Sequence, residues 1–168
     1  MGATQPAVRV LSFDDGPAAV AVINRAAEWY AEILPPAEVG EPEMTLQVWA
    51  DEARRMTWYG AFDDVDLVGV MGLEDAGDAV LFRHAYVLPE RQRQGVAGLL
   101  QSHLERQVRA GGRIIVGTYA ANYKARSVLE KAGYHASPDP EAVLRRYYDI
   151  PEDRLQSSVT YEKNIQRT

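Results

Sequence analysis

A basic segment that contains glycine carries the clearest chemical signal in this sequence. Residues 91–98 read Arg-Gln-Arg-Gln-Gly-Val-Ala-Gly and come just before an apolar stripe with helical spacing. The first turn of a helix has unpaired backbone N–H groups and a partial positive charge, so it binds phosphate groups well. Gly95 allows close approach of the backbone, and small Ala97 and Gly98 keep side chains out of the way. The segment predicts a phosphate-binding loop, although an ordinary basic helix start looks similar.

Histidine is the second residue type here that could do chemistry. His84 lies in a nearly continuous apolar run, and an imidazole titrates near neutral pH, which suits a general base. The alternative is a hydrogen-bonded histidine packed against a sheet. The sequence has no cysteine, which excludes a thiol nucleophile, a disulfide and a cysteine-bound metal. No histidine spacing resembles a metal-binding motif, so we expect no metal.

Hydrophobic periodicity predicts the elements that must position these residues. Alternating or nearly continuous apolar patterns predict strands over residues 7–13, 57–62, 67–73, 79–88, 113–118 and 157–162. Helical spacing predicts helices over residues 19–33, 46–53, 96–108 and 125–132. The order indicates an α/β (α+β) fold with a mixed central sheet of about seven strands and about four helices. The apolar strand 79–88 is expected at the centre of the sheet. No linker or repeat appears, so residues 1–168 are expected to form one domain.

Charge is distributed unevenly along the chain, whose formal net charge is −6. Residues 1–84 hold 15 acidic and five basic side chains, whereas residues 85–168 hold nine acidic and 13 basic ones. We therefore expect a polyanionic ligand on the C-terminal half and a cationic one near the N-terminal half, although a solvated surface explains the asymmetry equally well. Nucleic-acid binding is not expected. No stretch suits a membrane span or a secretory signal, so we expect a cytoplasmic protein with no membrane partner.

Two ordered motifs resemble those of the GNAT superfamily of N-acetyltransferases. Gln92-Arg93-Gln94-Gly95-Val96-Ala97 is similar to its Q/R-x-x-G-x-G/A signature, which cradles the pyrophosphate of acetyl-coenzyme A (acetyl-CoA). Asn122-Tyr123-Lys124-Ala125, followed by Glu130-Lys131-Ala132-Gly133-Tyr134, is similar to its second motif. The resemblance runs from about residue 7 to about residue 163 and implies a single GNAT domain. It also implies cofactor contacts at Gly98 and Asn122, and pairing of the backbone of Val87 and Leu88 with the pantetheine amides.

The resemblance implies direct acetyl transfer to a primary amine of a small molecule or a peptide N-terminus, in a monomer or homodimer. Such a reaction needs a base to deprotonate the amine and benefits from an acid to protonate the thiolate. Many relatives carry a tyrosine at the position of Leu129, and here Tyr123, Tyr119, Tyr134 or solvent could replace it as the acid. His84 and Tyr123 are our candidates for base and acid.

Two other functions stay open from the sequence. One is a non-catalytic acyl-CoA-binding sensor or degenerate GNAT module, because Leu129 stands where relatives carry tyrosine and Ala79-Val80-Leu81 offers no acidic residue where many carry glutamate. The other is a nucleotide-binding domain unrelated to acetyl transfer. Glu32, on the first predicted helix, is a further weak candidate for the acceptor pocket.

Overall fold

The computed structural model describes residues 4–166, in which it contains seven strands and six α-helices. The strands are β1 (Ala7–Val10), β2 (Thr57–Asp63), β3 (Asp66–Asp75), β4 (Val80–Val87), β5 (Arg113–Tyr119), β6 (His135–Ala136) and β7 (Ser158–Asn164). The helices are α1 (Gly16–Ala27), α2 (Tyr30–Ile33), α3 (Leu46–Glu52), α4 (Val96–Glu105), α5 (Tyr123–Lys131) and α6 (Pro140–Tyr147).

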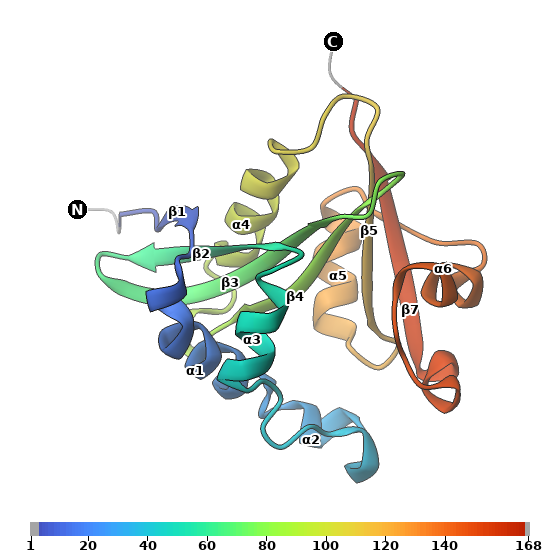
Figure 1. Ribbon diagram of the computed structural model, residues 1–168, viewed down its shortest axis with the longest axis horizontal. Helices are drawn as coiled ribbons and strands as arrows, with labels where there is room; N and C mark the ends of the chain where they lie inside the picture. Colours follow the sequence, from blue (N-terminus) through green and yellow to red (C-terminus); the bar gives the residue numbers. More distant parts are fainter. Residues whose placement is uncertain (1–3, 167–168) are drawn as a thin grey trace. The chain divides into compact units, whose positions relative to one another are not determined.

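The strands form one mixed sheet in the order β1-β2-β3-β4-β5-β7-β6 (Figure 1). The β1–β2, β2–β3, β5–β7 and β6–β7 pairs are antiparallel, whereas β4 and β5 are parallel. A parallel pair needs a long crossover connection, and the segment that contains α4 provides it. The predicted mixed sheet of seven strands is confirmed, as is the central position of β4.

The described chain divides into two compact units, and β4 passes from one to the other. The first unit comprises the residues up to Glu74 together with His84–Gln107, and the second comprises Asp75–Arg83 and the residues from Val108 onward. The phosphate-loop motif and His84 therefore belong to the first unit, whereas the second motif belongs to the second unit. The single domain expected over residues 1–168 stays a prediction.

Close helix packing holds the first unit together. A Cβ atom built on Gly16 would lie 2.9 Å from Leu46 Cδ1 and 3.1 Å from the Trp49 ring, so α1 and α3 approach closely at this glycine. Trp49 and Trp58 are almost completely buried and stack, with ring centroids 5.6 Å apart. They form part of an apolar core cluster that also includes residues of α1 and β3. This core supports the strand on which His84 lies.

The second unit is organised by the long antiparallel pair of β5 and β7, which runs in register from Arg113↔Asn164 to Tyr119↔Ser158. The Arg113 Nε atom donates to Glu162 Oε1 at 2.6 Å across this pair. The Tyr161 hydroxyl donates to Glu130 Oε1 at 2.9 Å, and this bond ties β7 to α5.

The described residues contain six α-helices where the sequence indicated about four, and two local features account for the difference. The helix expected over residues 19–33 is divided into α1 and the short α2. The α6 helix was not predicted, although its start has a recognisable signal: Asp139 Oδ1 accepts the Ala142 N–H at 3.1 Å, and Pro140 occupies the first turn.

The first strand is shorter than expected. It ends at Val10, and Phe13–Asp15 forms a 3-10 turn instead of continuing the strand. The Asp15 carboxylate accepts the Ser12 N–H at 2.7 Å and so turns the chain toward α1.

Candidate functional site

The N-terminus of α4 is open where the sequence predicts phosphate binding. Gly95 is the N-cap residue, its φ is +83°, and no side chain caps the helix. A Cβ atom built on Gly95 or on Gly98 would have no atom within 4 Å, so there is free space beside the first turn. Val96 is 2% exposed and anchors the helix in the core, and its neighbours on either side are glycine and alanine. First-turn N–H groups lack intrahelical acceptors and suit an anionic oxygen.

The polar side chains just before Gly95 largely brace the loop itself. Arg91 Nη1 lies 2.6 Å from Asp63 Oδ2, and Arg91 Nε donates to Gln94 Oε1 at 3.0 Å. Gln92 Nε2 donates to the Val87 carbonyl at 3.1 Å, which joins the loop to the end of β4. Arg93 is exposed and has a φ of +64°. Arg91 thus contacts other residues of the protein, whereas the side chain of Arg93 is exposed to solvent.

The end of β4 meets β3 through the backbone. The Leu88 N–H donates to the Val68 carbonyl at 2.9 Å. The Leu88 carbonyl accepts the Arg91 N–H at 2.9 Å, and the Val87 carbonyl accepts the Gln92 side-chain amide. The pairing of Val87 and Leu88 with a cofactor stays a prediction.

His84 has an unusual backbone conformation in the central strand. Its φ is +55°, which is uncommon for a residue with a side chain and interrupts the regular alternation of β4. Its Nε2 atom lies 2.6 Å from Glu52 Oε2, and its ring stacks on Trp58 with centroids 5.4 Å apart. The His84 side chain is 22% exposed to solvent. The imidazole therefore contacts Glu52 and Trp58 and is still partly exposed.

Glu52 was not among the residues that the sequence analysis selected. It is the last residue of α3 and only 8% exposed. Its other carboxylate oxygen, Oε1, lies 3.4 Å from Arg55 Nη2, and Arg55 Nε lies 3.0 Å from Glu74 Oε1. A sequence signal existed, because Glu52 follows Trp49 by three positions and so falls on the buried face of α3.

Asn122 and Tyr123 stand at the start of α5 in the second unit. Asn122 is the N-cap residue: its Oδ1 accepts the Ala125 N–H at 3.1 Å, and its Nδ2 donates to Thr118 Oγ1 at 3.2 Å. Tyr123 is 64% exposed. Leu129 is 5% exposed, so packing explains this residue at the position where many relatives have tyrosine. The cofactor contact of Asn122 and the acid role of Tyr123 stay predictions.

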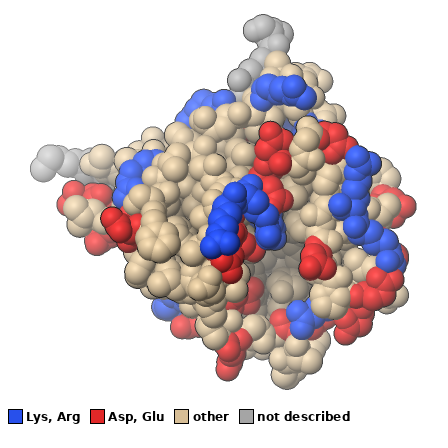
Figure 2. All heavy atoms as spheres, in the orientation of Figure 1, with Lys and Arg blue, Asp and Glu red and all other residues tan. Residues whose placement is uncertain are grey.

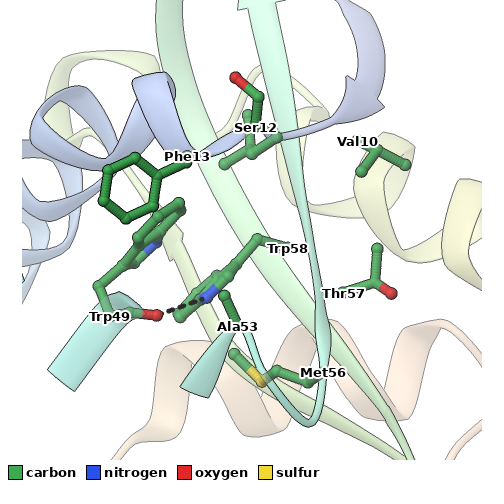
Figure 3. A pocket seen from close by; sticks show the side chains of 9 residues that line it. Val10, Ser12, Phe13, Trp49, Ala53, Met56, Thr57 and Trp58 are labelled. Atoms are coloured by element: carbon green, nitrogen blue, oxygen red, sulfur yellow. Dashed lines mark hydrogen bonds between the residues drawn. The ribbon is translucent and has the colours of Figure 1, made fainter. Parts of the chain in front are cut away.

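A cavity of about 250 Å³ lies beside the tryptophan pair in the first unit (Figure 3). Its lining includes Phe13, Trp49 and Trp58, and the Trp58 Nε1 atom donates to the Trp49 carbonyl at 3.2 Å. None of the residues predicted for catalysis or cofactor binding lines it. The cavity is therefore distinct from the start of α4.

Acidic side chains dominate one continuous part of the first unit. Between Arg25 and Arg54 the sequence has no lysine or arginine but has seven acidic residues: Glu28, Glu32, Glu38, Glu41, Glu43, Asp51 and Glu52. On the face drawn in Figure 2, groups of acidic and basic side chains lie scattered over a surface that is mostly neither acidic nor basic. Within residues 4–166, no group of three or more His, Asp or Glu side chains is arranged to hold a metal ion. No helix in that range is long and apolar enough to cross a membrane.

Comparison with solved structures identifies the fold. The chain superposes with a TM-score of 0.71 and 18% identity on the PaiA N-acetyltransferase from Thermoplasma acidophilum in complex with coenzyme A, covering 96% of this chain and 99% of the other. It superposes with a TM-score of 0.69 and 17% identity on the ribosomal-protein-S18-alanine N-acetyltransferase from Escherichia coli, covering 97% and 96%. It superposes with a TM-score of 0.66 and 14% identity on YncA, a putative acetyltransferase from Salmonella typhimurium with its cofactor acetyl-CoA, covering 98% of this chain and 96% of the other. The fold is that of the acetyltransferases.

The sequence itself supports the same grouping. Residues 23–134, more than half of the chain, match the acetyltransferase (GNAT) family. The protein therefore belongs to this family, as the two motifs indicated. No curated protein matches the sequence.

Proposed function

We propose that the protein is an acetyl-CoA-dependent N-acetyltransferase that acetylates a primary amine of a small molecule or a peptide N-terminus. The observation that carries the proposal is the glycine-capped start of α4, with open space beside Gly95 and Gly98. Family membership supports the same reaction class.

The residues at the start of α4 fit a diphosphate ester. A helix N-terminus without a side-chain cap offers N–H donors to phosphate oxygens, and the absence of Cβ atoms at two positions leaves room for them. When bound, acetyl-CoA would supply an acetyl group activated as a thioester. The residues that would hold it are Val87, Leu88, Gln92, Arg93, Gln94, Gly95, Val96, Ala97, Gly98 and Asn122.

His84 is the proposed base. An amine is largely protonated at neutral pH and must lose a proton before its nitrogen can attack a thioester. The His84 ring is partly exposed and held by Trp58 and Glu52, so it can accept that proton in a fixed orientation. A backbone N–H near Val87 would stabilise the negative charge that develops on the acyl oxygen.

Tyr123 is the proposed acid for the departing thiolate. Its phenol is accessible to solvent, and it directly follows the N-cap residue of the second motif. A thiolate is a tolerable leaving group at neutral pH, so the contribution of this proton donor should be modest.

The acceptor is proposed to be a cationic amine. All charged residues between Arg25 and Arg54 are acidic. One of them, Glu43, accepts a hydrogen bond at 3.3 Å from the hydroxyl of Tyr86, which lies two residues after His84 on the same strand. Acidic groups near the base would attract a positively charged substrate and repel an anionic one.

An acetylation screen tests the proposal. The purified protein would be mixed with acetyl-CoA and polyamines, aminoglycosides, amino acids or peptides with free amino termini, and thiol release would be recorded. We expect turnover with at least one cationic amine, and coenzyme A affinity that falls at least tenfold in Gly95→Val.

A matched control is Gly77→Val, because Gly77 has a similar φ of +90° and equally open surroundings. Unchanged coenzyme A affinity in Gly95→Val would refute the binding site. Binding of coenzyme A without thiol release for any amine would instead favour the non-catalytic sensor. The observation behind that alternative is Leu129, at the position where many relatives carry tyrosine.

A further inference from the structure

We propose that Glu43 is a specificity-determining residue that binds the second ammonium group of a diamine whose first amino group reacts at His84. The inference rests on the proposed function, and it narrows the acceptor from a cationic amine to an amine that carries two positive charges. The contacts that support it lie within the first unit.

Tyr86 holds the Glu43 carboxylate beside the strand that carries His84. The Tyr86 hydroxyl donates to Glu43 Oε1 at 3.3 Å, and both side chains are partly buried. A hydroxyl donor is neutral, so this bond orients the carboxylate without cancelling its negative charge. The Tyr86 ring also meets the buried Tyr30 ring edge-on, with centroids 6.3 Å apart. Packing therefore restrains the hydroxyl that contacts Glu43.

A second contact fastens the loop that carries Glu43 to α1. Asn24 Nδ2 donates to the Met44 carbonyl at 2.9 Å, and the Met44 N–H donates to Asn24 Oδ1 at 2.8 Å. Met44 is only 4% exposed, so its side chain anchors the same residue in the core. A side-chain amide that bonds both backbone groups of one residue restrains the chain at that point. Asn24 is thus a positioning residue for the neighbouring Glu43.

Gly40 leaves the space that the Glu43 side chain occupies. A Cβ atom built on Gly40 would lie 2.9 Å from Glu43 Oε2 and 3.2 Å from Glu43 Cα. The loop therefore folds closely on itself, and Oε2 fits beside residue 40 because glycine has no side chain. With Oε1 at Tyr86 and Oε2 at Gly40, both oxygen atoms of the carboxylate have defined neighbours.

The placement of Glu43 suits a second cation rather than the reacting amine. Tyr86 follows His84 by two positions on β4, and two residues of a strand span about 7 Å. Tyr86 packs against the apolar cluster that includes Trp58, on which His84 stacks, so both side chains meet the same part of the core. A diamine would therefore place one amino group at His84 and the other at Glu43. The carboxylate would accept charge-assisted hydrogen bonds from that second ammonium group.

Calorimetric titration tests this subsite without a chemical step. The ligands are putrescine, a diamine, and butylamine, a monoamine of the same chain length. Coenzyme A is present, because it has no acetyl group to transfer. We expect the parent protein to bind putrescine at least tenfold more tightly than butylamine, and Glu43→Gln to bind the two within threefold of each other.

The matched control is Glu41→Gln, at an exposed position on the same loop, which should keep the preference for the diamine. The same preference in Glu43→Gln as in Glu41→Gln overturns the inference. A parent protein that binds both amines equally well also overturns it.

Two further variants test the positioning. Gly40→Ala would displace the Glu43 oxygen, and Asn24→Asp replaces the donor to the Met44 carbonyl with an acceptor. We expect each to reduce the preference for putrescine at least threefold and to change coenzyme A affinity less than twofold. A general structural defect would instead weaken the binding of both amines equally, and that result would refute the positioning roles of Gly40 and Asn24.

Thiol-release kinetics separate this inference from the proposed function. Thiol release with putrescine and butylamine at equal kcat/KM would refute the subsite and support acetyl transfer. Preferential binding of putrescine that is lost in Glu43→Gln, without thiol release from acetyl-CoA, would support the subsite and refute acetyl transfer.

Discussion

Trp58 lies against His84, with their ring centroids 5.4 Å apart and their planes 29° from parallel. The same indole stacks on Trp49 at 5.6 Å and donates its N–H to the Trp49 carbonyl. The core of the first unit thus extends, through one side chain, to the residue that we propose as the base. The orientation of His84 depends on this packing as well as on its contact with Glu52.

Replacing Trp58 should therefore affect both stability and rate. Trp58→Leu is expected to cost about 3 kcal/mol of unfolding free energy, because it removes a nearly fully buried ring. It should also lower kcat, since the His84 ring loses its aromatic neighbour. Trp58→Phe, which keeps a ring, should lose less of both. Chemical denaturation and steady-state kinetics measure the two effects, and equal kcat values in both variants would contradict the positioning role of the stack.

Gly98→Ala should change stability and cofactor affinity in opposite directions. Gly98 lies in the first turn of α4, where alanine is the better helix former by about 0.5–1 kcal/mol. A Cβ atom there meets no protein atom within 4 Å, so the fold should gain stability. The same Cβ would occupy space proposed for the diphosphate, so coenzyme A affinity should fall. Thermal unfolding and calorimetric titration test this pair, and an affinity equal to that of the parent protein would show that the phosphates bind elsewhere.

Tyr123→Phe should reduce turnover without unfolding the protein. The ring is 64% exposed, so loss of its hydroxyl should change stability by less than about 0.5 kcal/mol. We expect kcat to fall severalfold, because the departing thiolate loses a proton donor. Tyr59→Phe, at a ring that is 8% exposed and was not a candidate for the acid, serves as the comparison. Unchanged kcat in Tyr123→Phe would remove Tyr123 as the acid and leave Tyr119, Tyr134 or solvent for that role.

The sequence contained much of the fold but little of the geometry around His84. The hairpin of β2 and β3, the central β4 and the start of α4 were predictable, because each follows from local periodicity or from a glycine at a helix end. The contact between Glu52 and His84 joins positions that are far apart in the chain, so local sequence patterns could not predict it. The left-handed backbone of His84 was equally hidden, since histidine seldom adopts it.

The second unit should show an acid-dependent loss of stability that one side chain controls. Burial by itself would raise the pKa of the Glu162 carboxyl. The hydrogen bond from Arg113, with the nearby Ser137 hydroxyl and the charges of Arg113 and His135, more than offsets this and lowers that pKa. A carboxyl whose pKa is lower in the folded state stabilises the fold above its unfolded pKa. That stabilisation is lost as the pH falls through the lower, folded value.

Glu162→Gln tests this dependence. At pH 7 the variant should be less stable by about 1 kcal/mol, because the bond from Arg113 is no longer charge-assisted. As the pH falls below about 4.3, the ordinary pKa of a glutamate, the parent protein should lose that advantage and the two unfolding free energies should converge. Glu141→Gln, at a largely exposed side chain on α6, provides the control. A difference between the parent protein and Glu162→Gln that stays constant from pH 7 to pH 3 would contradict the prediction, because a stabilising ion pair must weaken when its carboxylate is protonated.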